Sequence, residues 1–198
     1  RRRLMSATNR GAVRQDLDWY ETPMWCIWQL LDRVEFGQLI LDPGCGTGPI
    51  LHCLVEDDYP LAVGIELDEK RAARASRRGP GLNVAVGDFL TWRFRADYFD
   101  AVVSNPPYGK AREFINRSLE VVKPDGLVAM LLRLNFLGSS RDRMDVVGYG
   151  SGLYRVLVMS RRPSFINGNT DYCDYAWIVW KKGFVGTATV EVMPTEEV

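Results

Sequence analysis

The residues best suited to chemistry form a short turn that reads Asn105, Pro106, Pro107, Tyr108. Two consecutive prolines fix their φ angles and remove two N–H groups, so the Pro106 carbonyl oxygen is held rigidly beside the Asn105 amide. A planar amine such as N6 of adenine can donate one hydrogen to each acceptor, while Tyr108 stacks on the ring plane. The turn therefore predicts methyl transfer to a planar amine, catalysed by alignment and charge stabilisation without a strong general base.

A glycine-rich segment over residues 39–48 is the second candidate site. An apolar strand ends in Asp42, and Gly44, Gly46 and Gly48 follow at alternate positions before a predicted helix. Glycines in such a turn allow a ligand to approach backbone N–H groups that a Cβ would block. An acid at the strand tip would repel a phosphate, so the pattern favours a cofactor with an ammonium or sulfonium centre over a dinucleotide.

Two further acids follow the next predicted strands. Glu66 ends one of them, and its carboxylate can accept two hydrogen bonds from ribose hydroxyls. Asp88 ends the next and offers an acceptor for an adenine amine, with the ring of Phe89 to lie against its face. Each acid alone is consistent with an ordinary surface residue, but acids at three successive strand tips predict a nucleoside-bearing cofactor.

Alternating strands and helices must position these residues. Apolar runs predict strands over 38–41, 61–65, 82–86, 99–103 and 127–132, with helices over 49–57, 68–78 and 111–122. Two later strands, 154–159 and 175–180, predict an antiparallel hairpin at the sheet edge. The expected fold is α/β, a doubly wound, mostly parallel, seven-stranded Rossmann-like sheet, which places the candidate residues at one sheet edge.

Thr22 and Pro23 predict the start of an amphipathic helix that precedes the first strand. Thr22 is the expected N-cap, and Pro23 is expected at the first helical position. The segment 138–152, rich in glycine and serine, is expected to be a mobile loop near the site.

The chain has 198 residues and a mass of 22.5 kDa, which predicts one domain. We expect a basic flexible arm over 1–18, the domain over 19–182, a short tail over 183–198, and no separate target-recognition domain. The 25 basic and 25 acidic residues cancel, so a polyanion has to be held by a local patch. Four cysteines without metal-ligand spacing predict no metal site, and the absence of a long apolar run predicts a soluble, cytoplasmic protein without membrane contact.

The glycine-rich segment, together with the acids at 66 and 88, resembles the cofactor site of class I methyltransferases that use S-adenosylmethionine (SAM). Residues 19–23, Trp-Tyr-Glu-Thr-Pro, resemble the motif that borders the methionine part of SAM in adenine methyltransferases whose cofactor half comes first. The resemblance implies SAM as cofactor, with glycines around the methionine moiety, Glu66 on the ribose and Asp88 on the adenine. The implied cofactor-binding residues are Tyr20, Thr22, Pro23, Asp42, Gly44, Cys45, Gly46, Gly48, Glu66, Leu67, Asp88, Phe89 and Asn105.

The turn at 105–108 resembles the catalytic signature of methyltransferases that act on planar nitrogens. Segments 162–165, 170–172 and 175–180 resemble small phage and prophage DNA N6-adenine methyltransferases. The resemblance implies methylation of adenine in DNA, with the base rotated out of the duplex. The predicted substrate-binding residues are Tyr108, Lys110, Phe165, Arg133 and Arg141.

A basic patch supports nucleic acid as a partner. Six arginines lie between residues 133 and 162 against two aspartates, although solvated surface charge is the simpler alternative. Methylation of RNA adenine or of a protein glutamine amide remains open, as does a catalytically silent, SAM-fold subunit that binds nucleic acid.

Overall fold

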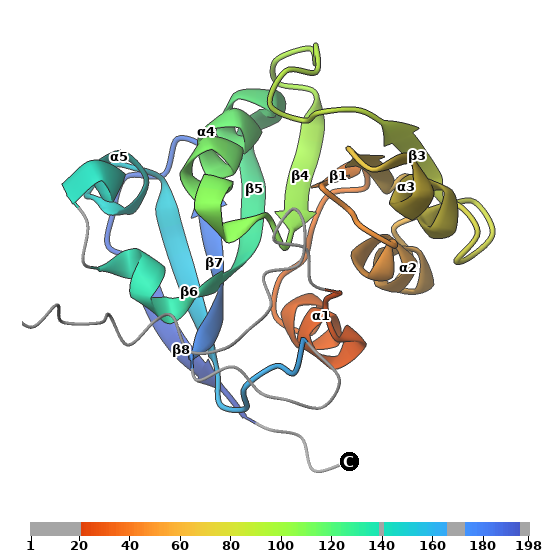
Figure 1. The fold of residues 1–198 in the computed structure, drawn as a ribbon. Coiled ribbons are helices and arrows are strands. Elements are labelled where there is room, and N and C mark those ends of the chain that lie inside the picture. Colours follow the sequence, from red (N-terminus) through yellow and green to blue (C-terminus); the bar gives the residue numbers. More distant parts are fainter. Residues whose placement is uncertain (1–20, 139–140, 166–172, 195–198) are drawn as a thin grey trace, which may run out of the picture.

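The structure, a computed structural model, describes residues 21–138, 141–165 and 173–194 (Figure 1). The strands are β1 (Ile40–Pro43), β2 (Val63–Glu66), β3 (Asn83–Val86), β4 (Phe99–Ser104), β5 (Val122–Arg133), β6 (Leu153–Met159), β7 (Tyr175–Lys181) and β8 (Thr189–Met193). The α-helices are α1 (Met24–Leu31), α2 (Pro49–Glu56), α3 (Glu69–Ala75), α4 (Ala111–Val121) and α5 (Met144–Val147), and three 3-10 turns are η1 (Tyr108–Lys110), η2 (Leu134–Leu137) and η3 (Arg141–Arg143).

The strands form one sheet in the order β3-β2-β1-β4-β5-β7-β6-β8. β7 is antiparallel to both neighbours, and the other neighbouring strands run parallel. The predicted α/β, mostly parallel sheet is confirmed. The predicted antiparallel pairing of the two late strands is also confirmed, as β6 with β7. The predicted count of seven strands is wrong, because the described residues form eight and β8 adds to the sheet beside β6.

β8 lies in the region expected to be only a tail. It pairs in parallel with β6, and the side chain of Met193 is fully buried. Glu191 accepts hydrogen bonds from Arg33 at 3.0 Å and from Arg155 at 3.0 Å, which ties β8 to the turn after α1 and to β6. The short alternation of valine with polar residues is a weak strand signal, and long-range ion pairs and parallel pairing decided the outcome.

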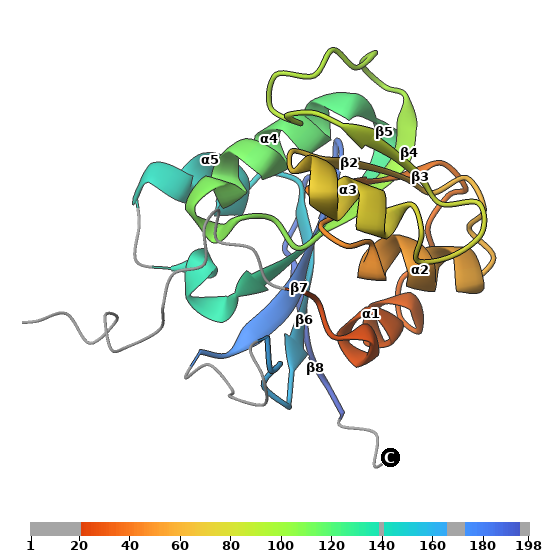
Figure 2. The same cartoon turned by 45° about the vertical axis from the view of Figure 1, so that its right-hand side comes forward.

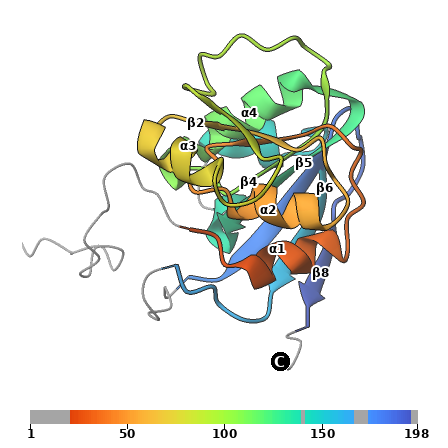
Figure 3. The ribbon, with the colours of Figure 1, turned by 90° about the vertical axis from the view of Figure 1, so that its right-hand side faces the viewer.

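Helices cover both faces of the sheet. Figure 2 shows α4 and α5 on one side of β6 and β7 with α1 on the other, and Figure 3 shows α1 packed beside α2. β7 connects the two layers through two buried tryptophans. Trp177 Nε1 donates to the Cys26 carbonyl oxygen in α1 at 2.8 Å, and Trp180 Nε1 donates to the Val146 carbonyl oxygen in α5 at 2.6 Å. These bonds fix both layers relative to the sheet.

Two local predictions are corrected by the structure. The expected loop over 138–152 contains η3 and α5 in its described part, and α5 packs against α4. Pro23, not Thr22, is the N-cap residue of α1, and no side chain caps that helix end. The hydroxyl of Thr22 instead accepts a hydrogen bond from the Asn105 side chain.

Candidate active site

The predicted cofactor loop, residues 44–48, follows β1 and is shaped by its glycines. Gly44, Gly46 and Gly48 have φ angles of 70°, 57° and 81°, a region that other residues rarely adopt. The Gly44 N–H donates to the Ile65 carbonyl oxygen at 2.7 Å, which anchors the loop to the end of β2. The predicted glycine turn is therefore present where β1 leads into α2.

Asp42 lies at the base of this loop and is 1% exposed. Neither carboxylate oxygen has a hydrogen-bond partner among the described residues. Burial raises the pKa of Asp42 well above its usual value; the nearby Ser104 hydroxyl opposes this shift, and the Glu66 carboxylate adds to it. Ser104 Oγ donates its proton to the Pro43 carbonyl oxygen at 2.6 Å, so that proton is not available to Asp42. A buried carboxylate without a partner fits a cationic ligand such as the ammonium group of SAM.

Glu66 is equally buried, 4% exposed, but its oxygens are engaged. One accepts the Gly46 N–H at 2.9 Å, and the other accepts the Asp68 N–H at 2.9 Å and the Arg71 guanidinium at 3.0 Å. Glu66 therefore holds the cofactor loop to β2 and α3. The predicted bond to ribose hydroxyls would have to share or replace the contact with Arg71.

We expect Glu66→Gln to destabilise the fold. The amide keeps the shape but weakens the bonds to Gly46 and Arg71 and removes the negative charge that pairs with the Arg71 guanidinium, which costs about 1–3 kcal/mol. Urea denaturation measures this free energy of unfolding. Glu69→Gln is the matched control, because Glu69 is exposed in the first turn of α3, the helix that holds Arg71. Equal stability of both variants would contradict the structural role of Glu66.

The predicted adenine-binding segment follows β3. Asp88 Oδ1 accepts the Leu90 N–H at 3.0 Å, and Leu67, after β2, is 54% exposed. Phe89 is 3% exposed and packs against Phe114, with ring centroids 5.1 Å apart. Its ring lies in the core instead of offering an open face, so it supports this wall of the site from behind.

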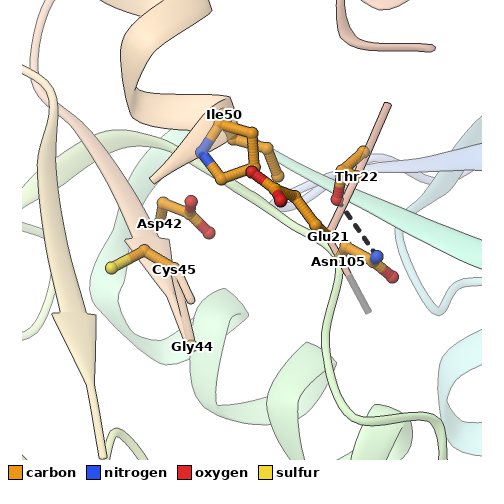
Figure 4. Close-up of a pocket in the computed structure, with 8 residues that line it drawn as sticks. Glu21, Thr22, Asp42, Gly44, Cys45, Ile50 and Asn105 are labelled. Carbon is orange, nitrogen blue, oxygen red and sulfur yellow. Dashed lines mark hydrogen bonds between the residues drawn. The ribbon is translucent and has the colours of Figure 1, made fainter. Parts of the chain in front are cut away.

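The turn over residues 105–108, called the elbow below, follows the end of β4 and lies next to the cofactor loop. Asn105 Nδ2 donates to Thr22 Oγ1 at 3.1 Å, and Tyr108 begins η1. One pocket joins the two parts, as Figure 4 shows. Its lining residues are Glu21, Thr22, Asp42, Gly44, Cys45, Pro49, Ile50 and Asn105. The structure thus brings the predicted catalytic amide and the predicted cofactor acid into the same pocket.

Tyr108 belongs to an aromatic cluster that also holds two of the predicted substrate-binding residues. The Arg133 guanidinium lies 5.3 Å from the centroid of the Tyr108 ring, and the rings of Phe165 and Tyr108 lie 5.0 Å and 6.0 Å from that of Tyr175. Arg133 Nε donates to the Tyr175 hydroxyl at 3.3 Å. Tyr175, 1% exposed, is thus the centre of the cluster and was missed from the sequence. No sequence pattern indicates this role, because Tyr175 comes to lie opposite Arg133 only through the β5–β7 pairing.

Two of the six arginines in the predicted basic patch, Arg155 and Arg162, pair with acids. Arg112 pairs with Asp145 at 2.9 Å and Arg162 pairs with Asp174 at 2.9 Å, whereas Arg155 is turned toward Glu191 in β8. Lys110 is exposed beside the elbow, and Arg141 is exposed on η3. Positive charge is therefore exposed at Lys110 and Arg141 among the described residues.

Some predictions concern residues outside the described part of the chain. Tyr20, the basic arm over 1–18 and the 170–172 segment belong to this group. Within the described residues, no helix has the length and apolarity needed to span a bilayer. The same residues contain no group of three or more histidine, cysteine or acidic side chains arranged to hold a metal.

Comparisons with known proteins agree with this geometry. Residues 40–126 match a family profile described as methyltransferase domain. The fold is shared with the Pyrococcus horikoshii protein PH1948, at a TM-score of 0.65 and 16% identity over 84% of this chain and 86% of that one. It is also shared with a Listeria monocytogenes protein described as a class I SAM-dependent methyltransferase, at a TM-score of 0.63 and 16% identity over 86% and 62% of the two chains. Residues 40–126 are thus similar to a methyltransferase domain, and the fold is the one seen in these two solved structures.

Among curated relatives, the modification methylase CviBIII of Paramecium bursaria Chlorella virus NC1A is 34% identical over 119 residues, 48% of this chain and 31% of the relative. The type II methyltransferase M.CvrRI of Paramecium bursaria Chlorella virus XZ-6E is 29% identical over 171 residues, 66% and 45% of the two chains. A tRNA1(Val) (adenine(37)-N6)-methyltransferase of Bacteroides thetaiotaomicron is 39% identical over 83 residues, 38% and 35%. The chain spans less than half the length of each of these relatives.

Proposed function

We propose that this chain transfers a methyl group from SAM to the exocyclic N6 amine of adenine in DNA. The observation that carries the proposal is the single pocket lined both by Asn105 of the elbow and by Asp42 and Gly44 of the cofactor loop. SAM supplies a methyl group bound to a positively charged sulfur. The protein has to place an amine in line with that methyl group and exclude competing orientations.

The elbow residues suit this task. The Asn105 amide oxygen and the Pro106 carbonyl oxygen are two fixed acceptors for the two hydrogens of a planar amine, which directs the amine lone pair toward the methyl donor. Tyr108 stacks on the ring of the incoming base, and Asp42 accepts the ammonium group of the cofactor. The amine proton leaves after methyl transfer, so no strong base is needed at the elbow.

Support for DNA as the substrate comes from the relatives and from the aromatic cluster. The two viral relatives are named a modification methylase and a type II methyltransferase, names that are typical of enzymes that modify DNA. A base in a duplex has to rotate out of the stack before its amine reaches the pocket, and an extruded base needs aromatic walls such as Tyr108 and Phe165. Exposed Lys110 and partly buried Arg133 lie beside these walls and suit contacts to the phosphate backbone.

An RNA adenine is the second candidate substrate, because the Bacteroides relative is named for the same amine in tRNA. A protein glutamine amide is the third, since a release factor glutamine methyltransferase of Bradyrhizobium diazoefficiens is 35% identical over 97 residues, 46% of this chain and 32% of the relative. The intact elbow argues against a silent subunit that only binds SAM or nucleic acid.

The test offers radiolabelled SAM with duplex DNA, single-stranded DNA, RNA and a glutamine-bearing protein in parallel. Digestion of the labelled nucleic acid and mass spectrometry of its nucleosides identify the methylated position. N6-methyladenine in DNA is the expected product. Label found only in RNA or only in protein would refute DNA as the substrate.

We expect Tyr175→Phe to slow methyl transfer while leaving SAM binding unchanged. The substitution removes only the hydroxyl that accepts the Arg133 bond, so Arg133 is less firmly held over the Tyr108 ring. Loss of one such bond, about 1 kcal/mol, corresponds to roughly a fivefold lower kcat/KM for DNA. Tyr154→Phe is the control, because Tyr154 packs against Phe184, outside the cluster. Equal rates for the two variants would contradict the role given to Tyr175.

A further inference from the structure

Thr22 contacts the catalytic amide, although the sequence predicted a helix cap and a cofactor ligand at this position. Thr22 is 4% exposed, and its Oγ1 accepts a hydrogen bond from Asn105 Nδ2 at 3.1 Å. In Figure 4, Nδ2 of Asn105 is turned toward Thr22 and the amide oxygen is turned away from it. The two residues are 83 positions apart in the chain, so this contact exists only in the folded protein.

The orientation of this amide decides what the elbow can bind. An asparagine side chain presents an acceptor at one end and two donors at the other, and rotation about Cβ–Cγ exchanges them. A target amine that offers two hydrogens needs the oxygen end. With Nδ2 bonded to Thr22, the oxygen end is turned away from Thr22.

We propose that Thr22 is a positioning residue that fixes the acceptor orientation of the Asn105 amide for methyl transfer. The inference rests on the proposed function and adds a residue that acts through Asn105 without touching the reacting atoms. Thr22 then acts on methyl transfer through Asn105, so removal of the Thr22 hydroxyl should lower turnover more than it weakens SAM binding.

The position of Thr22 is itself fixed from the cofactor side. The neighbouring Glu21 accepts a hydrogen bond from Thr47 Oγ1, in the cofactor loop, at 3.1 Å and pairs with Arg78 after α3. Arg78 Nη1 also lies 3.4 Å from the Thr47 carbonyl oxygen. The 21–23 segment is thus held at one end to the cofactor loop and contacts the elbow at the other, which couples the placement of the two halves of the site.

The main test compares Thr22→Val with Thr22→Ser. Valine keeps the shape but removes the hydroxyl, whereas serine keeps it. We expect Thr22→Val to lower kcat about tenfold with a SAM dissociation constant within about twofold of the wild-type value, and Thr22→Ser to restore most of the rate. A raised dissociation constant with unchanged kcat would overturn the proposal in favour of a cofactor ligand, and equal rates in all three proteins would overturn it outright.

The Asn105→Asp variant tests whether Thr22→Val acts through the orientation of the side chain at position 105. In Asn105→Asp both ends of the side chain are acceptors, so orientation no longer matters. Adding Thr22→Val to Asn105→Asp should therefore cost less than it costs in the wild-type protein. Equal costs in both backgrounds would indicate a packing role for Thr22 and contradict the proposal.

A substitution outside the pocket tests the same coupling without a change at position 22, which could by itself disturb the fold. Arg78→Gln weakens the anchor of Glu21, and we expect about a threefold lower kcat with SAM binding retained. The exposed Arg77→Gln is its matched control. A rate in Arg78→Gln equal to that of the control would contradict the coupling through the 21–23 segment. Failure of the wild-type protein to methylate any DNA adenine would instead refute the proposed function.

Discussion

Asn105→Ala is expected to lower the rate of methyl transfer by about 10²–10³-fold, the typical loss when one preorganised polar group is removed from a reacting centre. Alanine removes the amide oxygen that we propose accepts the amine hydrogen and leaves only the proposed second acceptor, the Pro106 carbonyl oxygen. The cofactor acid Asp42 and the glycine loop are untouched, so the dissociation constant for SAM should stay close to the wild-type value.

Single-turnover methyl transfer to duplex DNA and calorimetric titration with SAM measure these two quantities separately. Asn83→Ala is the matched control, because Asn83 lies at the start of edge strand β3 and its side chain bonds only locally, to the Gly81 carbonyl oxygen, among the bonds seen in the described residues. Unchanged methyl transfer in Asn105→Ala would refute the role assigned to the elbow.

Asp42→Asn is expected to weaken SAM binding by about 100-fold or more while making the SAM-free protein more stable. The binding loss follows because the substitution removes the buried charge that would pair with the cofactor ammonium, and breaking such a pair costs about 3–5 kcal/mol. The gain in stability follows because both oxygens of Asp42 are buried without partners. Removing that desolvated charge should raise the free energy of unfolding by about 1–3 kcal/mol at neutral pH.

The pH dependence of stability and of SAM affinity tests the same role of Asp42, because the two are expected to change in opposite directions as the pH rises. Burial raises the pKa of Asp42 above its unfolded value, so the folded protein retains this proton at pH values where the unfolded chain has lost it. The associated stability is fully present below the unfolded pKa and is lost as the pH rises through the raised pKa. The proposed pairing with the SAM ammonium group requires the Asp42 carboxylate, so the affinity for SAM should rise over the same interval. Both dependences should be absent in Asp42→Asn.

Thermal unfolding and SAM titration across pH measure both effects. Asp58→Asn is the control, since Asp58 is exposed and its positive φ angle is tolerated by asparagine. A less stable Asp42→Asn protein, or one that still binds SAM normally, would contradict the role of Asp42. The contrast with Glu66→Gln is informative, because two buried acids of one site should respond to amide substitution with opposite changes in stability.

The sequence by itself determined most strands of the sheet and the backbone conformation of single positions. Apolar runs placed β1, β2 and β4 within two residues of their observed starts, because a buried parallel strand has to be apolar. The three glycines were identified because positive φ angles leave few alternatives at those positions. The paired prolines marked the elbow, since their restriction on the backbone is local.

The tertiary structure alone decided which side chains meet. It turned Thr22 from an expected helix cap into a partner of Asn105, placed Tyr175 at the centre of the aromatic cluster, and paired β8 with β6. It also made Glu66 a brace for the cofactor loop through Arg71, while leaving Asp42 without a partner. These outcomes depend on contacts between residues far apart in the chain, and neither periodicity nor local backbone preference carries information about which distant partners a side chain finds.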